Sequence, residues 1–351
     1  MSSLKILYLY SELVGYQMSI FREYVSKYNA EVHVVNWDKN KIKPYLPEEI
    51  NGVTYYKRSD FNKHSILSLT LQINPDIIYI SGWMDKGYLY VTKQMKKKGI
   101  PIVTAFDDIW KGSIRQRLGA LVFPLLYRKY FTHSWVAGAY QFEFAKKMGF
   151  KNSEIIFNML SADTSIFNQD NYLHDKKNSQ KKSFMYVGNF RKVKGTDILL
   201  EAFNLYTEKY KGCWGLVCIG NGKLGSELIK NKKINVIPFS TSSEIIELTK
   251  FSDVFILPSR NDQWGVVVHE FTSMGMPLLL SENVGAKSEF FISGFNGFQF
   301  DENSPTRLAE MMKKFEEMDN LKLIEMGENS KMLSKRINVK TSAANFISLI
   351  N

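Results

Sequence analysis

Short, nearly uninterrupted apolar runs alternate with amphipathic segments along the whole chain. `KILYLYS` (5–11), `DIIYISG` (76–82) and `DVFILPS` (253–259) are typical of these runs. Strands that are apolar on both sides belong to parallel sheets, because the crossover connections place helices over both faces. The pattern therefore predicts an α/β fold of the doubly wound kind.

The runs are too many for one sheet, and a polar segment at 161–183 separates them into two groups. A length of 351 residues also suits two domains. We expect two Rossmann-like domains that face each other across a cleft. The predicted boundaries are a first domain at 1–165, a linker at 166–182, a second domain at 183–335, and a helix at 336–351 that packs back toward the first domain. The other strands are expected at 31–37, 53–58, 101–108, 133–138, 154–160, 183–189, 213–220, 234–240 and 277–282.

The chain offers no candidate for a membrane span. Its longest apolar stretch, 118–127, holds a proline and is about half the roughly twenty residues that a span needs. The start of the sequence lacks a signal-peptide core. Cys213 and Cys218 are the only cysteines, and in one strand they would face opposite sides. A disulfide or zinc site is not expected, and a cytoplasmic location is.

The positive charge is concentrated in the first part of the chain. The net charge is +11, and residues 1–160 hold 22 Lys and Arg against 13 Asp and Glu. Nucleic acid, an anionic membrane, a phosphorylated substrate or a generally basic surface could each account for this excess. Aromatic residues do not alternate with these charges as in RNA-binding motifs, so we expect no nucleic-acid partner.

Residues 111–131 combine positive charge with an apolar helical pattern. One interpretation is a core helix with a solvated basic edge. The favoured one is an interfacial helix that attaches the protein to the inner face of a plasma membrane and reaches a lipid-linked acceptor. Its cations are Lys111, Arg115, Arg117, Arg128 and Lys129.

The stretch `RNDQWGVVVHE` (260–270) brackets a glycine and three valines with two acids. If a buried helix begins at about Gly265, the free amides of Gly265, Val266 and Val267 can bind an anion. Asp262 and Glu270 then suit the hydroxyl groups of a sugar and a ribose, since a carboxylate accepts such bonds. The alternative is an N-capping aspartate and a surface glutamate.

A second loop, `GNFRKVKG` (188–195), follows a predicted strand and precedes a predicted helix. Gly188 permits a sharp turn, and Arg191 and Lys194 stand beside the start of that helix. Cations at a helix N-terminus make an anion site. The alternative is a solvated basic turn.

Several motifs of residues 183–320 together resemble glycosyltransferase family four, the retaining enzymes of the GT-B fold that act in bacterial surface-polysaccharide synthesis. `PSRNDQWGVVVHEFTSMGMP` (258–277) resembles the family's Glu-x7-Glu element, with Asp262 in place of the first glutamate and Phe271 in place of the usual alanine. `GNFRKVKG` resembles its diphosphate-binding element, but Asn189 occupies the usual arginine position. `ENVGAKSEFFISGFNGFQF` (282–300) resembles a third motif.

The resemblance implies site roles in the second, donor-binding domain. Lys194 and Arg191 would contact the diphosphate, Glu270 the ribose, and Asp262 the donor sugar. The loop at Phe239 and Ser240 would contact the base of a UDP- or GDP-sugar. The family needs no metal, so we expect no cofactor.

In the first, acceptor-binding domain, Gly15 falls at the family's first loop. Asp107 falls where relatives carry a histidine, which makes it a candidate catalytic residue beside Asp262 and Glu270. Any histidine-dependent mechanism is therefore in doubt. His133 and His269 are expected to be packing or solvent-facing groups.

The favoured function is retaining transfer of a hexose or N-acetylhexosamine from a nucleotide diphosphate sugar to a lipid-linked or other glycan acceptor. Polysaccharide, capsule or lipopolysaccharide synthesis is the expected setting. The alternatives are a GT-B sugar-nucleotide epimerase, a phosphorylase, and a non-catalytic nucleotide-sugar binding protein.

Overall fold

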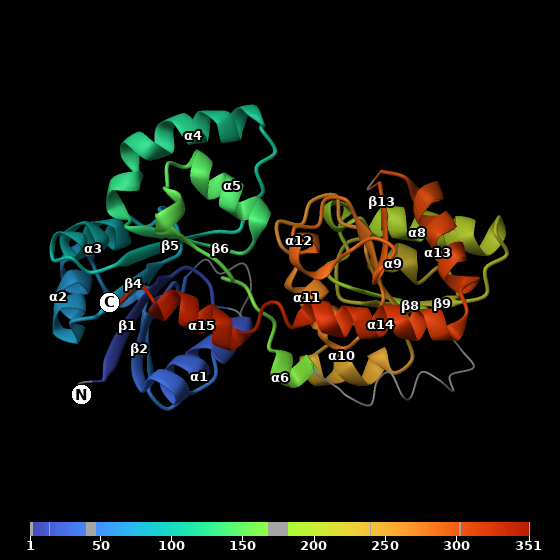
Figure 1. Cartoon of the computed structure of the whole chain (residues 1–351), viewed down its shortest axis with the longest axis horizontal. Helices are drawn as coiled ribbons and strands as arrows, with labels where there is room; N and C mark the ends of the chain where they lie inside the picture. The colour runs from blue at the N-terminus through green and yellow to red at the C-terminus, as the bar shows by residue number, and fades with distance from the viewer. Residues whose placement is uncertain are drawn as a thin grey trace. The chain divides into compact units, whose positions relative to one another are not determined.

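The computed structural model describes residues 3–13, 15–39, 47–167, 182–238, 240–301 and 303–350. The chain divides into two compact units (Figure 1). The first unit joins Met1–Ser161 to Ile337–Asn351, and the second is Ala162–Arg336. Most of the predicted linker, 168–181, lies outside the described residues.

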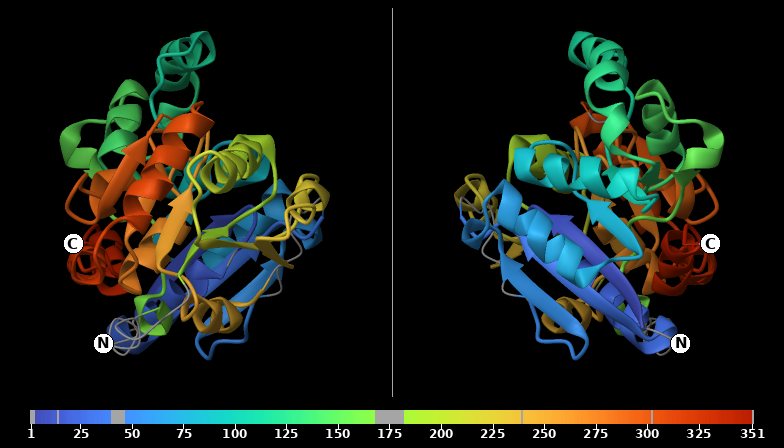
Figure 2. Two further views of the ribbon diagram at one scale, coloured as in Figure 1. Left: turned by 90° about the vertical axis from the view of Figure 1, so that its right-hand side faces the viewer. Right: turned by 90° about the vertical axis from the view of Figure 1, so that its left-hand side faces the viewer.

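The described residues of the first unit form a parallel seven-stranded sheet with the order β3-β2-β1-β4-β5-β6-β7. β1 and β2 lie side by side in the views of Figure 2. The strands are β1 Leu4–Tyr10, β2 Ala30–Asn36, β3 Val53–Lys57, β4 Ile77–Ile80, β5 Ile102–Phe106, β6 His133–Val136 and β7 Ile155–Ile156. The helices are α1 Tyr16–Tyr28, η1 Arg58–Asp60, α2 Lys63–Ile73, α3 Lys86–Lys97, α4 Ile114–Leu126, η2 Arg128–Tyr130, α5 Ala139–Lys147, η3 Asn152–Glu154 and α15 Val339–Ile347.

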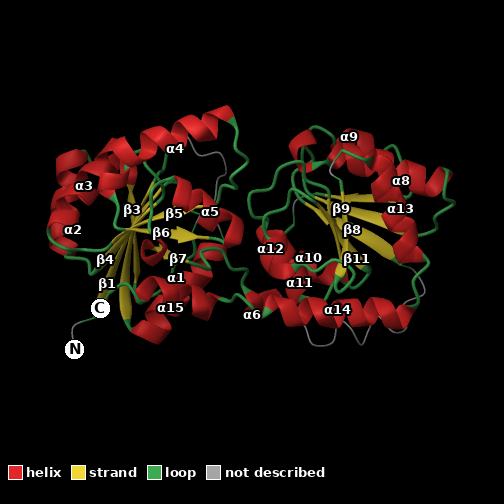
Figure 3. Cartoon of the chain, turned by 45° about the horizontal axis from the view of Figure 1, so that its top comes forward, coloured by secondary structure: helices red, strands yellow, loops and turns green. Residues whose placement is uncertain are grey.

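Helices cover both faces of this sheet, as Figure 3 shows. Successive side chains of a strand point to opposite faces. Tyr8 of β1 accordingly packs in the core under α1 and α15, with Phe21 and Phe346. Its neighbour Leu9 packs in the other core, under α2, α3, α4 and α5. Burial on both faces explains the continuous apolar runs of the sequence.

The described residues of the second unit form a parallel six-stranded sheet with the order β10-β9-β8-β11-β12-β13. Sequence analysis missed its last strand, β13. The strands are β8 Ser183–Val187, β9 Gly215–Ile219, β10 Ile234–Ile237, β11 Val254–Leu257, β12 Leu278–Ser281 and β13 Gly297–Phe300. The helices are α6 Thr164–Phe167, η5 Lys192–Lys194, α8 Thr196–Glu208, α9 Gly225–Leu228, α10 Ser242–Thr249, α11 Val266–Ser273, α12 Lys287–Phe290, α13 Pro305–Glu316 and α14 Asn320–Ser334.

Both sheets have the doubly wound topology that the sequence predicts, so the fold class is confirmed. In each, the strand order runs outward in both directions from two central strands: β1 and β4 in the first, β8 and β11 in the second. Ligands of such sheets bind at the carboxyl ends of these central strands. The loops that follow them are therefore the places to look for a functional site.

Candidate functional site

In the second unit, the loops after β8 and β11 pack tightly against each other. Gly195 has φ +70°, and a Cβ at this position would lie 1.8 Å from the carbonyl oxygen of Pro258. The amide of Arg260 donates to the carbonyl of Val193 at 3.1 Å. Only glycine fits at position 195, because a side chain would separate the loops.

An ion pair also fixes these loops. The guanidinium of Arg260 binds the carboxylate of Asp197 through two hydrogen bonds of 2.7 and 3.0 Å. Asp197 lies in the first turn of α8, next to the sequence-predicted anion loop. Burial opposes ionisation of Asp197, but the bonds from Arg260 outweigh it and lower its pKa. Sequence analysis missed this pair, because no pattern links positions 63 residues apart.

Asp262 and Lys194, two predicted donor-binding residues, meet directly. The Lys194 Nζ donates to Asp262 Oδ2 at 2.8 Å, and the hydroxyl of Ser259 donates to the same oxygen at 3.3 Å. Asp262 is 9% exposed, and Lys194 is half-buried. A cation and a carboxylate thus stand side by side at the carboxyl ends of the central strands.

The helix α11 lies beside this pair and begins at Val266, close to the predicted start at about Gly265. Gly265 precedes it with φ +86°, and a Cβ there would lie 3.5 Å from the Asp262 carboxyl carbon. The first-turn amides of a helix have no acceptor within the helix. Val266 and Val267 are half-buried and only Val268 is buried, so the start of the helix is less buried than expected. The first turn of α11 therefore retains access to solvent.

Glu270 lies further along α11 and is half-buried. Loss of surrounding water raises the pKa of its carboxyl to about 7. Among the described residues, the structure shows no hydrogen bond to this carboxylate. A carboxyl with a raised pKa and no protein partner is typical of a functional site.

The remaining donor-binding candidates are less closely joined to this cluster. Arg191 is exposed and contributes its backbone to the turn before η5. Gly188 directly follows β8, and its amide donates to the carbonyl of Ile219. Ser240 follows the edge strand β10, two strands away from β8. Phe239 lies outside the described residues.

Two neighbours of the cluster are packing residues. The buried ring of His269 accepts from the amide of Ala162 at Nδ1, while Nε2 lies 3.0 Å from the carbonyl oxygen of Ser334. Phe271 stacks on Phe255 of β11 with ring centroids 4.0 Å apart. The departure from alanine at position 271 thus fills the space between helix and sheet.

The first unit contains a pocket of about 300 Å³ at the carboxyl ends of β1, β4 and β5. Asp107 and Asp108 line it, and burial raises the pKa of both carboxyls. Gly15 lies just before α1, whose first residue, Tyr16, lines the pocket. Desolvation, followed by the charge of Asp107, raises the pKa of Tyr16 to about 12. The other lining residues are Tyr8, Tyr10, Ser11, Gln17, Ser19, Ile20, Tyr79, Ser81, Gly82, Trp83, Ala105, Phe106, Trp135, Met159, Leu160, Ser161, Val339 and Ser342.

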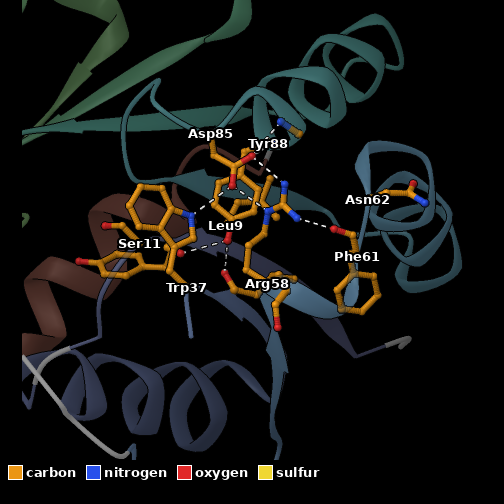
Figure 4. Close-up of polar contacts among 12 residues, drawn as sticks. Leu9, Ser11, Trp37, Arg58, Phe61, Asn62, Asp85 and Tyr88 are labelled. Atoms are coloured by element: carbon orange, nitrogen blue, oxygen red, sulfur yellow. Dashed lines mark hydrogen bonds and ion pairs between the residues drawn. The ribbon is translucent and has the colours of Figure 1, made fainter. Parts of the chain in front are cut away.

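A polar network centred on Asp85 joins Arg58 and Trp37 in the first unit (Figure 4). The carboxylate of Asp85 binds Arg58 through bonds of 2.7 and 3.0 Å, and it accepts from Trp37 Nε1 at 3.2 Å. It also accepts from two amides of the first turn of α3 and so caps that helix. The network joins segments that follow β2, β3 and β4.

The surface of α4 is strongly apolar. Among its thirteen residues only Phe123 is buried. Its exposed apolar residues, with their exposed fractions, are Ile114 (79%), Leu118 (58%), Leu121 (69%), Val122 (44%), Leu125 (77%) and Leu126 (51%). Figures 1 and 2 show α4 projecting at the edge of the first unit.

The predicted membrane-facing cations near α4 differ in their surroundings. Lys111, Arg115, Arg117 and Lys129 are exposed. Arg128 is half-buried, pairs with Glu154 at 2.7 Å and stacks on Phe150. Its charge is thus already engaged within the first unit. Among the described residues, no helix is long and apolar enough to cross a membrane.

Part of the chain resembles a known family of proteins. Residues 170–332 match the family model of glycosyl transferases group 1. The D-inositol 3-phosphate glycosyltransferases of Corynebacterium urealyticum and Corynebacterium glutamicum are both 23% identical to the chain, over 177 and 182 residues. These stretches cover 47% and 48% of this chain but only 41% and 43% of those proteins. The chain therefore matches less than half the length of these curated relatives.

Solved structures of the same fold match the whole chain. A glycosyltransferase from Rickettsia africae has a TM-score of 0.75 at 13% identity and covers 100% of this chain and 98% of its own. Anabaena HepE in complex with UDP has a TM-score of 0.75 at 15% identity, with 99% of both chains covered. Such low identities show the fold alone. The fold is thus that of the GT-B structures, and residues 170–332 resemble glycosyl transferases group 1.

Proposed function

We propose that the chain is a retaining glycosyltransferase that moves a hexosyl or N-acetylhexosaminyl group from a UDP- or GDP-sugar to a glycan acceptor. One observation carries the proposal. The Lys194–Asp262 pair adjoins the first turn of α11, and the half-buried Glu270 lies on the same helix. Helix amides and a cation suit a diphosphate, and carboxylates suit the hydroxyls of ribose and sugar. Similar structures from Anabaena were solved with UDP and with UDP-glucose.

In the proposed reaction, the acceptor oxygen forms a bond to the anomeric carbon while the bond from that carbon to the diphosphate breaks. The leaving phosphate takes the acceptor proton, and attack comes from the same face. The positive charge of Lys194 and Arg191, with the amides before Val268, would stabilise the departing diphosphate. We propose that no metal or other cofactor is needed. Asp107 would hold or orient the acceptor.

The test is a transfer assay on the full chain with a panel of labelled UDP- and GDP-sugars and a membrane lipid extract. We expect nucleotide release that depends on acceptor. Asp262→Ala and Glu270→Ala should each lower the rate by about two powers of ten or more, because each removes a bond to a donor hydroxyl in a desolvated site. Acceptor-dependent transfer that survives both substitutions would overturn the proposal. Binding without turnover would favour a non-catalytic binding protein.

We also propose that the acceptor is lipid-linked and that α4 binds the anionic inner face of a bacterial plasma membrane, in the synthesis of a polysaccharide, capsule or lipopolysaccharide. Two observations support this: the exposed apolar face of α4, and the cations beside it with no acidic residue between Asp108 and Glu143. An apolar face rimmed with cations is typical of helices that lie in a membrane interface.

The membrane proposal is tested by flotation with vesicles of phosphatidylglycerol and phosphatidylcholine at low salt. We expect binding that falls as salt rises and is lost in Leu121→Glu/Leu125→Glu. Leu71→Glu, at a 43% exposed position on α2, is the matched control and should bind normally. Equal flotation of the double variant and the native chain would contradict the proposal.

A further inference from the structure

As far as the structure describes the pocket of the first unit, the two charged side chains that line it are both acidic. Asp107 and Asp108 line it, and among the lining residues that the structure describes none is Lys, Arg or His. The positive charge of Arg115 partly offsets the rise in the pKa of Asp108, but Arg115 is not among the residues that line the pocket. A phosphate placed here would face two carboxylates and no cation within the lining itself. Like charges at short range in a partly desolvated site disfavour binding strongly.

The walls of the pocket are aromatic. Tyr79 stacks against Tyr8 and Tyr10, with ring centroids 4.7 and 5.5 Å apart. Trp83 and Trp135 also line the pocket. Aromatic rings offer an apolar face to the C–H groups of a sugar ring, and nearby polar atoms can bind its hydroxyls. The pocket therefore combines apolar surfaces with acceptors of O–H bonds.

The polar groups of the pocket are suited to hydroxyl groups. The carboxylates of Asp107 and Asp108 accept O–H bonds, and the hydroxyls of Ser11 and Ser81 can both donate and accept. Ser81 is itself held by the amide of Ser11 at 2.8 Å. The raised pKa of each aspartate shows that the pocket already disfavours negative charge. A second negative group would meet the same opposition.

We propose that this pocket binds the acceptor as an uncharged sugar ring and rejects acceptors that carry a phosphate on that ring. The inference rests on the proposed function and restricts the class of acceptor that the enzyme would use. It separates this chain from the relatives named as D-inositol 3-phosphate glycosyltransferases, whose name specifies a phosphorylated acceptor. A lipid-linked acceptor agrees with the inference where its pyrophosphate lies outside the pocket.

The test compares two pairs of ligands on the full chain: methyl glucoside with glucose 6-phosphate, and myo-inositol with inositol 3-phosphate. Binding is followed by saturation-transfer NMR and by tryptophan fluorescence, with UDP present. We expect the phosphorylated member of each pair to bind about a hundredfold more weakly, as one close like-charge contact implies. Equal or tighter binding of the phosphorylated member would overturn the inference, as would failure of both neutral ligands to bind.

Variants identify the source of the discrimination. Asp107→Asn/Asp108→Asn should reduce the ratio within each pair by about tenfold or more, because amides keep polar atoms in place but remove the charge. Asp60→Asn, at an exposed position of the same unit, should leave the ratio unchanged. An unchanged ratio in the double variant would contradict the inference. Circular dichroism checks that each variant is folded.

The same samples distinguish this inference from the proposed function. Binding of UDP is measured separately by calorimetry. If UDP and UDP-sugars do not bind, the proposed function fails whatever the pocket takes. If UDP binds and transfer occurs but phosphorylated rings bind as well as neutral ones, only the inference about the acceptor fails.

Discussion

At the scale of single residues, Glu270 makes a direct prediction about pH. Its pKa is raised to about 7, and bonds from ribose hydroxyls would favour the ionised form. Binding of a nucleotide should therefore release protons and become tighter as pH rises through about 7. Calorimetry between pH 5.5 and 8.5, in buffers of different ionisation enthalpy, measures both effects.

The matched variant for this prediction is Glu270→Gln, which should abolish the pH dependence and the proton release. Glu328→Gln, at an exposed position of α14, should preserve them. A pH dependence that remains in Glu270→Gln would assign it to another group.

The same carboxyl affects the stability of the fold in a defined direction. A carboxyl whose pKa is raised in the folded state lowers stability as pH rises from about 4.3 toward 7. Glu270→Gln should remove that loss.

The Lys194–Asp262 pair predicts a contrast between stability and binding. Lys194 is half-exposed, so the pair should contribute about 1 kcal/mol or less to the free energy of unfolding. Neutralising Lys194 with Lys194→Gln should nevertheless weaken binding of UDP or GDP about tenfold or more, because it would remove the charged donor that we propose for the diphosphate. Urea unfolding measures the free energy of unfolding, and calorimetry measures nucleotide binding, for Lys194→Gln, for Asp262→Ala and for the variant that combines them. A loss of stability without a loss of nucleotide binding would make the pair structural.

Sequence patterns anticipated single residues only where local chemistry decides their role. The positions of Gly265 before a helix and of Lys194 beside another could be predicted, because a helix start is a local feature. The contact between Lys194 and Asp262, and the pair of Arg260 with Asp197, could not be, because they depend on which loops the sheet brings together. Gly195 is the last residue of the motif at 188–195, whereas its closeness to Pro258 comes from tertiary packing.

At the scale of elements, apolar runs in the sequence identified most of the strands. They indicated less well which side of a helix faces solvent. β13 was missed because its four residues are not a continuous buried run. At 154–160 a full strand was predicted, but only Ile155–Ile156 pairs with β6. For α4, the pattern showed apolar and basic character but not which side faces solvent. That side is set by the shape of the surrounding unit.

The α4 helix contacts the pocket of the first unit through its buried residue, Phe123. Phe123 packs edge-to-face on Trp83 and on Phe106, which both line the pocket, with ring centroids 4.9 and 5.7 Å apart. If α4 binds lipid, Leu121→Glu/Leu125→Glu should raise KM for a lipid-linked acceptor about tenfold or more but leave KM for a short soluble acceptor nearly unchanged. Steady-state kinetics with both acceptors measure this. Equal effects on the two would indicate damage to the pocket itself.

The Arg58–Asp85 network predicts an effect on stability. Removal of one partner in Arg58→Ala leaves a largely buried carboxylate, so we expect a loss of about 2–4 kcal/mol in the free energy of unfolding. Burial opposes ionisation of Asp85, but bonds from Arg58 and the Tyr88 amide lower its pKa. Such a group stabilises above about pH 4, and the stability is lost as pH falls through the lowered pKa. Urea unfolding at pH 7 and pH 3.5 should show a smaller effect of Arg58→Ala at the lower pH.

At the scale of the whole molecule, the first unit depends on residues from the end of the chain. Phe346 of α15 stacks on Trp135, with centroids 5.0 Å apart, and packs beside Tyr8 and Tyr79. Phe346→Ala should cost about 3–5 kcal/mol, because it leaves a cavity in an aromatic core. The loss should fall on the first unit alone, since every one of these partners belongs to it.

The consequence is a separation of two unfolding transitions. In Phe346→Ala, tryptophan fluorescence and far-UV circular dichroism should show the first unit unfolding at lower urea concentration, while binding of UDP or GDP by the second unit persists. Lys340→Ala, at an exposed position of α15, should behave like the native chain. If nucleotide binding is lost together with the first transition, the units unfold as one body, and their cores cannot be treated as independent. If it persists, donor binding depends only on residues 162–336, where the group 1 match lies.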